Sequence, residues 1–240
     1  MSGHSKWAQI KRQKGAADIK KGAAFTKLAN AVTVAAREGG GDPAMNFKLR
    51  LTIERARAAN MPKDNIERAI KRGTGELAGV TLDNITYDGF GPGGAALIVE
   101  TLTDNRNRTA QAIKTLFAKH GGNLGAPGSV SWMFEQRGVA HIKKIEPWNE
   151  EQQLKLIELG VEDIVDEGDE IAVLTKPDEL RGLTERIQQE EWIVSEAVVA
   201  FWPKTPLDFP TGRDGEQLGT LLEALEDNDD VQNVATNAVL

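Results

Sequence analysis

The sequence contains no cysteine and only three histidines, His4, His120 and His141. The lack of cysteine excludes a disulfide scaffold, a thiol nucleophile, an iron–sulfur cluster and any cysteine-based zinc site. It is also typical of proteins in a reducing compartment, so we expect a cytoplasmic location. With so few histidines we expect no metal centre, and nothing else in the sequence indicates a cofactor.

Long apolar runs and the signatures of common enzymes are missing as well. No run approaches the roughly eighteen apolar residues that indicate a membrane span, and the start of the chain lacks the apolar core of a secretory signal. The P-loop, HExxH and GxSxG patterns are all absent. We therefore expect a protein that is not an enzyme, with no membrane partner and no small-molecule substrate.

Charge is distributed very unevenly along the chain, although the formal net charge of −7 looks unremarkable. Residues 1–77 hold 16 Lys and Arg against 7 Asp and Glu, a net charge of +9. Residues 78–240 hold 13 Lys and Arg against 29 Asp and Glu, a net charge of −16. This asymmetry indicates a module that binds a polyanion, joined to a part that does not.

The basic part of the sequence predicts three helices. Apolar residues recur at helical spacing over 18–38, and the three glycines that follow would end this helix. Asp42 and Pro43 predict the start of the second helix, because Asp caps free N–H groups and Pro is tolerated at the first helical position. The third helix is predicted from about Pro62 to Arg72. Residues 1–77 should therefore form a small helical bundle.

The acidic part predicts strands and helices in alternation. Residues 137–200 follow the order β-α-β-β-α-β, the split pattern of a ferredoxin-like domain. Before them we expect a sheet that includes strands at 96–102 and 130–134, with 121–128 as a loop. A helix and a strand predicted after residue 206 cannot form a domain alone, so we expect them to return to that sheet.

The predicted fold class is thus α+β and multidomain: a three-helix bundle followed by two ferredoxin-like α/β domains, the third domain inserted in the second. The expected boundaries are 1–77 for the bundle, 78–135 plus 206–240 for the discontinuous α/β domain, and 136–205 for the acidic inserted domain.

The strongest functional signal is a basic segment at the start of the chain. The first 27 residues hold seven Lys or Arg and a single acid, Asp18. Lys and Arg attract phosphate oxygens through charge and hydrogen bonds, and their binding releases counterions. Trp7 would either stack on an exposed base or anchor the segment to the bundle. The residues predicted to bind nucleic acid here are Lys6, Trp7, Lys11, Arg12, Lys14, Lys20, Lys21 and Lys27.

Cations in the second and third predicted helices extend this surface. Glu54 and Glu67 are spaced to pair with Arg50 and Lys71, so part of the charge is expected to be neutralised internally. No side-chain pattern is specific enough to name bases, and the prediction is a broad surface for phosphates. Its further members are Lys48, Arg50, Arg55, Arg57, Lys63, Arg68, Lys71 and Arg72.

A second candidate anion site lies where a buried strand is predicted to lead into a helix. Free N–H groups at a helix start favour anions, and Arg106 and Arg108 beside Asn105 would strengthen this preference. The alternative is a structural one, in which Asn105 caps the helix and the two arginines face solvent.

Several motifs in this sequence resemble those of the YebC/PmpR family. They include Gly3-His4-Ser5-Lys6-Trp7, Gly39-Gly40-Gly41-Asp42-Pro43, Gly91-Pro92-Gly93-Gly94 and Thr103 to Thr109, and the match extends from residue 2 to about Asn237. The resemblance implies a cytoplasmic protein of three domains, with a helical domain followed by two α/β domains.

This resemblance implies two related functions. Family members are usually described as transcriptional regulators that bind DNA, while others, one of them mitochondrial, act as translation factors at the ribosome and in bacteria relieve stalling at proline-rich stretches. A single basic module and a body of net charge −16 suit contact with RNA or the ribosome slightly better. A further alternative is a protein-interaction adaptor that uses residues 146–196, a segment with 16 acidic and 4 basic residues that could bind a basic protein.

Overall fold

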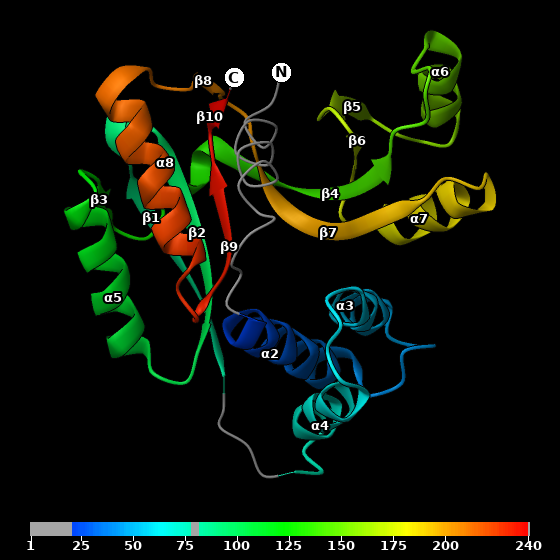
Figure 1. Ribbon diagram of the computed structural model, residues 1–240, viewed down its shortest axis with the longest axis horizontal. Helices are drawn as coiled ribbons and strands as arrows, with labels where there is room; N and C mark the ends of the chain where they lie inside the picture. The colour runs from blue at the N-terminus through cyan, green and yellow to red at the C-terminus, as the bar shows by residue number, and fades with distance from the viewer. Residues whose placement is uncertain (1–20, 78–81, 240) are drawn as a thin grey trace. The chain divides into compact units, whose positions relative to one another are not determined.

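The computed structural model describes residues 21–77 and 82–239 (Figure 1). These residues fall into two compact units. The first unit contains the described residues 21–77 and 82–130 together with Thr211–Val234. The second unit contains Ser131–Pro210 together with the residues from Ala235 onward. Along the sequence, the second unit therefore interrupts the first.

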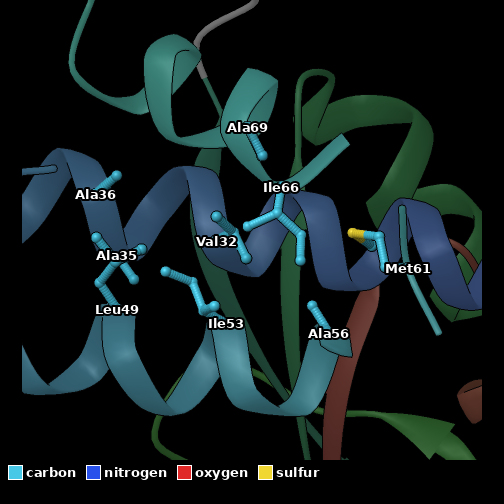
Figure 2. Close-up of a cluster of buried hydrophobic side chains, with 9 residues drawn as sticks. All are labelled: Val32, Ala35, Ala36, Leu49, Ile53, Ala56, Met61, Ile66 and Ala69. Carbon is cyan, nitrogen blue, oxygen red and sulfur yellow. The ribbon is translucent and has the colours of Figure 1, made fainter. Parts of the chain in front are cut away.

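Three helices of the first unit pack around a common apolar core (Figure 2). They are α2 (Lys21–Gly39), α3 (Phe47–Ala58) and α4 (Lys63–Gly73). Helix α2 contacts both of the other helices, so the three predicted helices do form a bundle. The buried core residues are Val32, Ala35, Ala36, Leu49, Ile53, Ala56, Met61, Ile66 and Ala69.

The second helix begins several residues later than predicted, at Phe47 rather than at Asp42 and Pro43. Helix α3 is capped by Asn46, whose Oδ1 accepts a 3.0 Å hydrogen bond from the Leu49 N–H. The amide of Asn46 also donates to the Ala35 carbonyl at 2.7 Å, so Asn46 ties the helix start to α2. Asp42 instead accepts from the Ala44 N–H and closes a turn. Asn46 is the cap rather than Asp42 because its side chain hydrogen-bonds backbone groups of α2 and α3 at the same time.

A four-stranded sheet forms the rest of the first unit, in the order β3-β1-β2-β9. Strand β1 runs antiparallel to both β2 and β3, and the helices α5 and α8 pack against each other. Figure 1 shows both helices lying along this sheet. Its elements are β1 (Asp83–Phe90), the 3-10 turn η1 (Pro92–Gly94), β2 (Ala96–Thr103), α5 (Arg106–Lys119), β3 (Asn123–Leu124), α8 (Gly212–Glu226) and β9 (Val231–Thr236).

The second unit contains the other four-stranded sheet, in the order β5-β6-β4-β7. All three strand pairs are antiparallel, and the chain follows the predicted β-α-β-β-α-β order. A short parallel pair, β8 with β10, completes the unit. Its elements are β4 (Phe134–Lys143), α6 (Glu150–Glu158), β5 (Asp163–Asp166), β6 (Glu170–Thr175), α7 (Leu180–Gln189), β7 (Val194–Pro203), β8 (Leu207–Asp208) and β10 (Ala238–Val239).

The strand predicted at 130–134 does not exist. Val130 is fully buried, but its N–H donates to the Asp88 carboxylate at 3.1 Å rather than to a neighbouring strand. The 3-10 turn η2 (Ser131–Met133) follows, and Phe134 then begins β4 of the second sheet. Val130 is therefore buried as a single apolar residue, without the strand pairing that the pattern of 130–134 predicted.

The α+β fold with a helical N-terminal region and two antiparallel sheets is confirmed. The strand predicted after residue 206 returns to the first sheet as β9, and the helix predicted before it, α8, contacts α5 and η1 of the same unit. Among the described residues, no helix has the length and apolarity needed to cross a membrane.

Candidate nucleic-acid interface

Six of the predicted nucleic-acid-binding residues lie outside the described residues, namely Lys6, Trp7, Lys11, Arg12, Lys14 and Lys20. Their role stays a prediction. Lys21 begins α2. Lys27 lies within α2, where its Nζ donates to the backbone carbonyl of Glu226.

Several cations of the predicted surface have partners inside the protein. Lys48 forms a 2.7 Å ion pair with Glu38, and the Arg50 guanidinium lies 5.3 Å from the ring centroid of Phe47. Glu67 contacts Lys63 at 3.5 Å, four residues earlier, so the predicted pair of Glu67 with Lys71 was wrong. These contacts reduce the charge that Lys48 and Lys63 offer to a ligand.

Helix α4 presents the densest group of cations without ion pairs. Lys71 and Arg72 lie three and four positions after Arg68, so the three cations lie on the same side of the helix. Ile66 and Ala69 hold the opposite side in the core, which directs the three cations to solvent. All three are exposed, and none forms an ion pair with any residue in the described ranges.

Arg57, near the end of α3, is likewise exposed and without an ion pair within the described part of the chain. Arg55 is exposed on the same helix. We call Arg57, Arg68, Lys71 and Arg72 the free cations of the bundle.

The placement of these cations has an electrostatic cost. Like charges three and four positions apart on a helix repel one another by a few tenths of a kcal/mol per pair. The carbonyl end of α4 offsets part of this for Lys71 and Arg72, which lie in its last turn. Arg68 lies earlier in the helix and gains less from this effect. A bound polyanion would relieve the remaining repulsion for all three.

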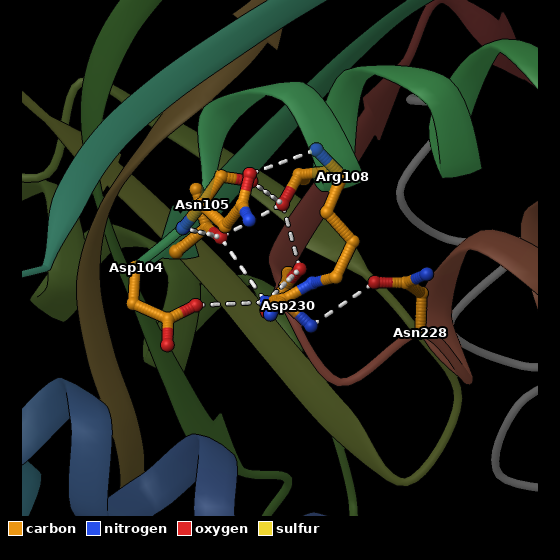
Figure 3. A network of polar contacts seen from close by, with 7 residues as sticks. Asp104, Asn105, Arg108, Asn228 and Asp230 are labelled. Carbon is orange, nitrogen blue, oxygen red and sulfur yellow. Dashed lines mark hydrogen bonds and ion pairs between the residues drawn. The ribbon is translucent and has the colours of Figure 1, made fainter.

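The second candidate anion site is occupied by the protein's own groups (Figure 3). Asn105 caps α5 by accepting a 3.1 Å hydrogen bond from the Arg108 N–H. Arg106 pairs with Asp83 at 2.8 Å, and its hydrogen bond lowers the pKa of the Asp83 carboxyl below its usual value. Arg108 contacts Asp104 at 2.9 Å and Asp230 at 3.0 Å. The Asn105 cap is the one that the structural alternative predicts, but the two arginines, which that alternative leaves facing solvent, contact carboxylates instead.

Sequence reasoning missed one ionisable pair in the second unit. His141 Nδ1 lies 3.2 Å from Glu167 Oε2, and the Glu167 side chain is completely buried. Burial lowers the pKa of the His141 imidazole, but the close contact with Glu167 and the negative charges of Glu167, Glu196 and Glu170 outweigh burial and raise this pKa above its ordinary value of 6.5. No local signal connects positions 141 and 167, because the sheet brings them together.

Two family models together cover most of the chain. The model of the TACO1/YebC N-terminal domain matches residues 5–76, and the model of the TACO1/YebC second and third domains matches residues 82–238. The chain belongs to the TACO1/YebC family. The free cations of the bundle therefore lie in the family's N-terminal domain.

Relatives within the family match over nearly their full length. A probable transcriptional regulatory protein of Desulfotalea psychrophila is 50% identical over 237 residues, which cover 99% of this chain and 95% of the relative. Another probable transcriptional regulatory protein, from Caldanaerobacter subterraneus, is 48% identical, and the match covers 100% of this chain and 99% of the relative. A third, from Thermotoga maritima, is 50% identical, and the match covers 99% of this chain and 93% of the relative.

A solved structure also matches the whole fold. The crystal structure of a conserved hypothetical protein from Aquifex aeolicus superposes with a TM-score of 0.89 at 42% sequence identity. The match covers 98% of this chain and 96% of that one. The α+β architecture is therefore common to both proteins.

Proposed function

We propose that this protein is a cytoplasmic regulator of gene expression that binds nucleic acid through its basic N-terminal domain and catalyses no reaction. The observation that carries the proposal is the outward side of α4, where Arg68, Lys71 and Arg72 are exposed and lack ion pairs among the described residues. Such cations neutralise phosphates with little desolvation. The names of the relatives, which describe probable transcriptional regulators, agree with a regulatory role.

The mode of contact follows from the same surface. Arg and Lys on one helix face bind phosphates and so fix the position of the protein along the nucleic acid, but they do not distinguish bases. The basic residues 6–20 would lengthen this contact along the backbone of the nucleic acid. We therefore expect affinity to depend strongly on salt and weakly on sequence.

Double-stranded DNA is the first candidate ligand, because the relatives are named as transcriptional regulators. RNA, including that of the ribosome, is the second. The net charge of −16 beyond residue 77 favours it, since this charge repels phosphates and confines contact to one end of the chain. An extended duplex would have to avoid the rest of the protein, whereas a folded RNA can present one local backbone segment.

Sedimentation of cell lysate through sucrose gradients, with and without magnesium, separates these two candidates. The RNA candidate would be supported if the protein migrates with ribosomal particles in magnesium and shifts together with them when removal of magnesium makes them dissociate. Migration with free protein, together with salt-dependent binding of the purified protein to duplex promoter fragments, would support the DNA candidate. Failure of the purified protein to bind either duplex DNA or ribosomal RNA at low salt would contradict the proposed function itself.

A further inference from the structure

Helix α6 exposes two adjacent aliphatic side chains. Leu154 and Ile157 lie three positions apart, and are therefore on the same side of the helix. They are 59% and 55% exposed, whereas Leu156 on the other side is fully buried. The side of α6 that faces solvent therefore has an apolar centre.

Three glutamates surround this apolar pair. Glu150 and Glu158 lie one helical turn before and after Leu154, and Glu151 lies three residues before it. All three are exposed, and none pairs with a cation in the portion of the chain that is described. Lys155, the single cation of α6, forms its ion pair with Glu190 at 2.5 Å, and its charge also attracts Glu151 and Glu158 without forming an ion pair with either. We call these two aliphatic residues and three glutamates the α6 outer face.

The fold gives no reason for this arrangement. Leu154 and Ile157 remove little apolar surface from water, so polar residues at these positions would serve α6 equally well. The capping box of Asn149 and Gln152 already fixes the start of the helix. Burial of the apolar pair by a partner would be favourable, and cations from that partner would neutralise the glutamates.

We propose that the α6 outer face is a docking surface for a basic protein segment in which an apolar side chain is flanked by Lys or Arg. Leu154 and Ile157 receive the apolar side chain, and the glutamates receive the cations. Charge selects a protein over a nucleic acid, because residues 146–196 hold 16 acids and 4 bases, a net charge of −12. The proposal is independent of nucleic-acid binding by the N-terminal domain.

A labelled helical peptide of Leu and Lys, with Leu at helical spacing, is the probe, and fluorescence anisotropy with the full chain measures its affinity. We expect Leu154→Ser with Ile157→Ser to weaken binding by about tenfold or more, as the loss of central apolar anchors does. The variant Glu150→Gln, Glu151→Gln, Glu158→Gln should weaken binding and flatten its salt dependence. The matched control is Ile193→Ser, which alters an aliphatic residue that is 58% exposed outside α6 and should leave the affinity unchanged.

Three results would overturn the proposal. Equal affinity of the Leu154→Ser, Ile157→Ser variant, or equally tight binding of an all-Lys peptide, would show that charge alone attracts the probe. Concentration-dependent dimers of the wild-type chain that disappear in the same variant would show that the occupant is a second copy of the protein. Unchanged circular dichroism and thermal unfolding of each variant establish that its fold is intact.

A cross-linking experiment in cells tests the surface without a model peptide. A photoreactive group placed at Leu154 should capture a protein through a segment with an apolar residue beside Lys or Arg, and the same group at Ile193 should not. Cross-links from Leu154 to acidic segments, or to nucleic acid, would contradict the proposal.

Discussion

The hydroxyl of Thr109 donates a 2.6 Å hydrogen bond to the carboxylate of Asp230, 121 residues later in the chain. Thr109 lies in the first turns of α5, and Asp230 directly precedes β9. The backbone carbonyl of Asp230 also accepts a 2.7 Å hydrogen bond from the Leu102 N–H in β2. Asp230 therefore connects the returning strand to elements that precede the inserted unit.

Asp230→Ala should lower the free energy of unfolding of the first unit by about 1–3 kcal/mol, because Thr109 is fully buried and loses a charged acceptor. Urea unfolding followed by circular dichroism measures this change. Asp229→Ala is the control, since the neighbouring carboxylate is exposed and makes no hydrogen bond or ion pair within the described residues. An equal effect of both substitutions would contradict a specific role for Asp230.

Replacement of Arg68, Lys71 and Arg72 by Gln should weaken nucleic-acid binding and reduce its salt dependence. Each phosphate contact that is lost should lower the slope of log affinity against log salt by about 0.9 for duplex DNA or about 0.7 for a single strand. Anisotropy titrations with duplex DNA and with single-stranded RNA over a salt series measure both quantities.

A control with the same change of charge distinguishes location from net charge. Lys114, Lys119 and Lys143 are exposed cations outside the bundle and without ion pairs among the described residues. Their replacement by Gln should leave the salt slope close to that of the wild type. If both triple variants lose affinity equally, the α4 surface is not the binding site.

Gly73→Ala should destabilise the helical bundle. A Cβ atom at Gly73 would lie 2.3 Å from the Thr33 carbonyl oxygen and 2.7 Å from Ala36 Cβ, both on α2. Backbone and a buried methyl group cannot move aside, so we expect a loss of about 1–3 kcal/mol. Thermal unfolding measures it. Gly219→Ala in α8 meets no atom within 4 Å and should instead stabilise the protein by roughly 0.5–1 kcal/mol.

The His141–Glu167 pair should make the stability of the second unit depend on pH. The pKa of His141 is raised in the folded protein, so protonation stabilises the fold below the ordinary value of 6.5. This contribution is lost as the pH rises from 6.5 through the folded pKa. Unfolding measured between about pH 5.5 and 8.5 should show this decline, and His141→Gln should remove it. A decline that persists in His141→Gln would assign it to other groups.

Sequence periodicity predicted the elements of the second unit well, because each strand and helix there buries one regular face. It failed where a single side chain decides a boundary. Asn46 rather than Asp42 caps α3 because its amide also reaches Ala35 of α2. That contact depends on how the helices pack, which the local sequence does not contain.

The basic character of the candidate interface was predictable from composition, but the choice of free cations was not. Lys48 and Arg68 look alike in the sequence, yet Lys48 is paired with Glu38, ten positions away. Arg108 is engaged by Asp230, 122 positions away. Pairing of this kind depends on tertiary structure. Only the fold therefore shows which cations are already paired within the protein and which are available to a ligand.

The interruption of the first unit by the second also sets the order in which the protein can be completed during synthesis. The first sheet lacks its edge strand β9 until residues 231–236 have been made. It also lacks Leu218, Leu221, Leu222 and Leu225, the buried residues of α8. The β5-β6-β4-β7 sheet needs only residues 134–203, which are contiguous. The inserted sheet can therefore form while the sheet that precedes it on the nascent chain still waits for its final strand.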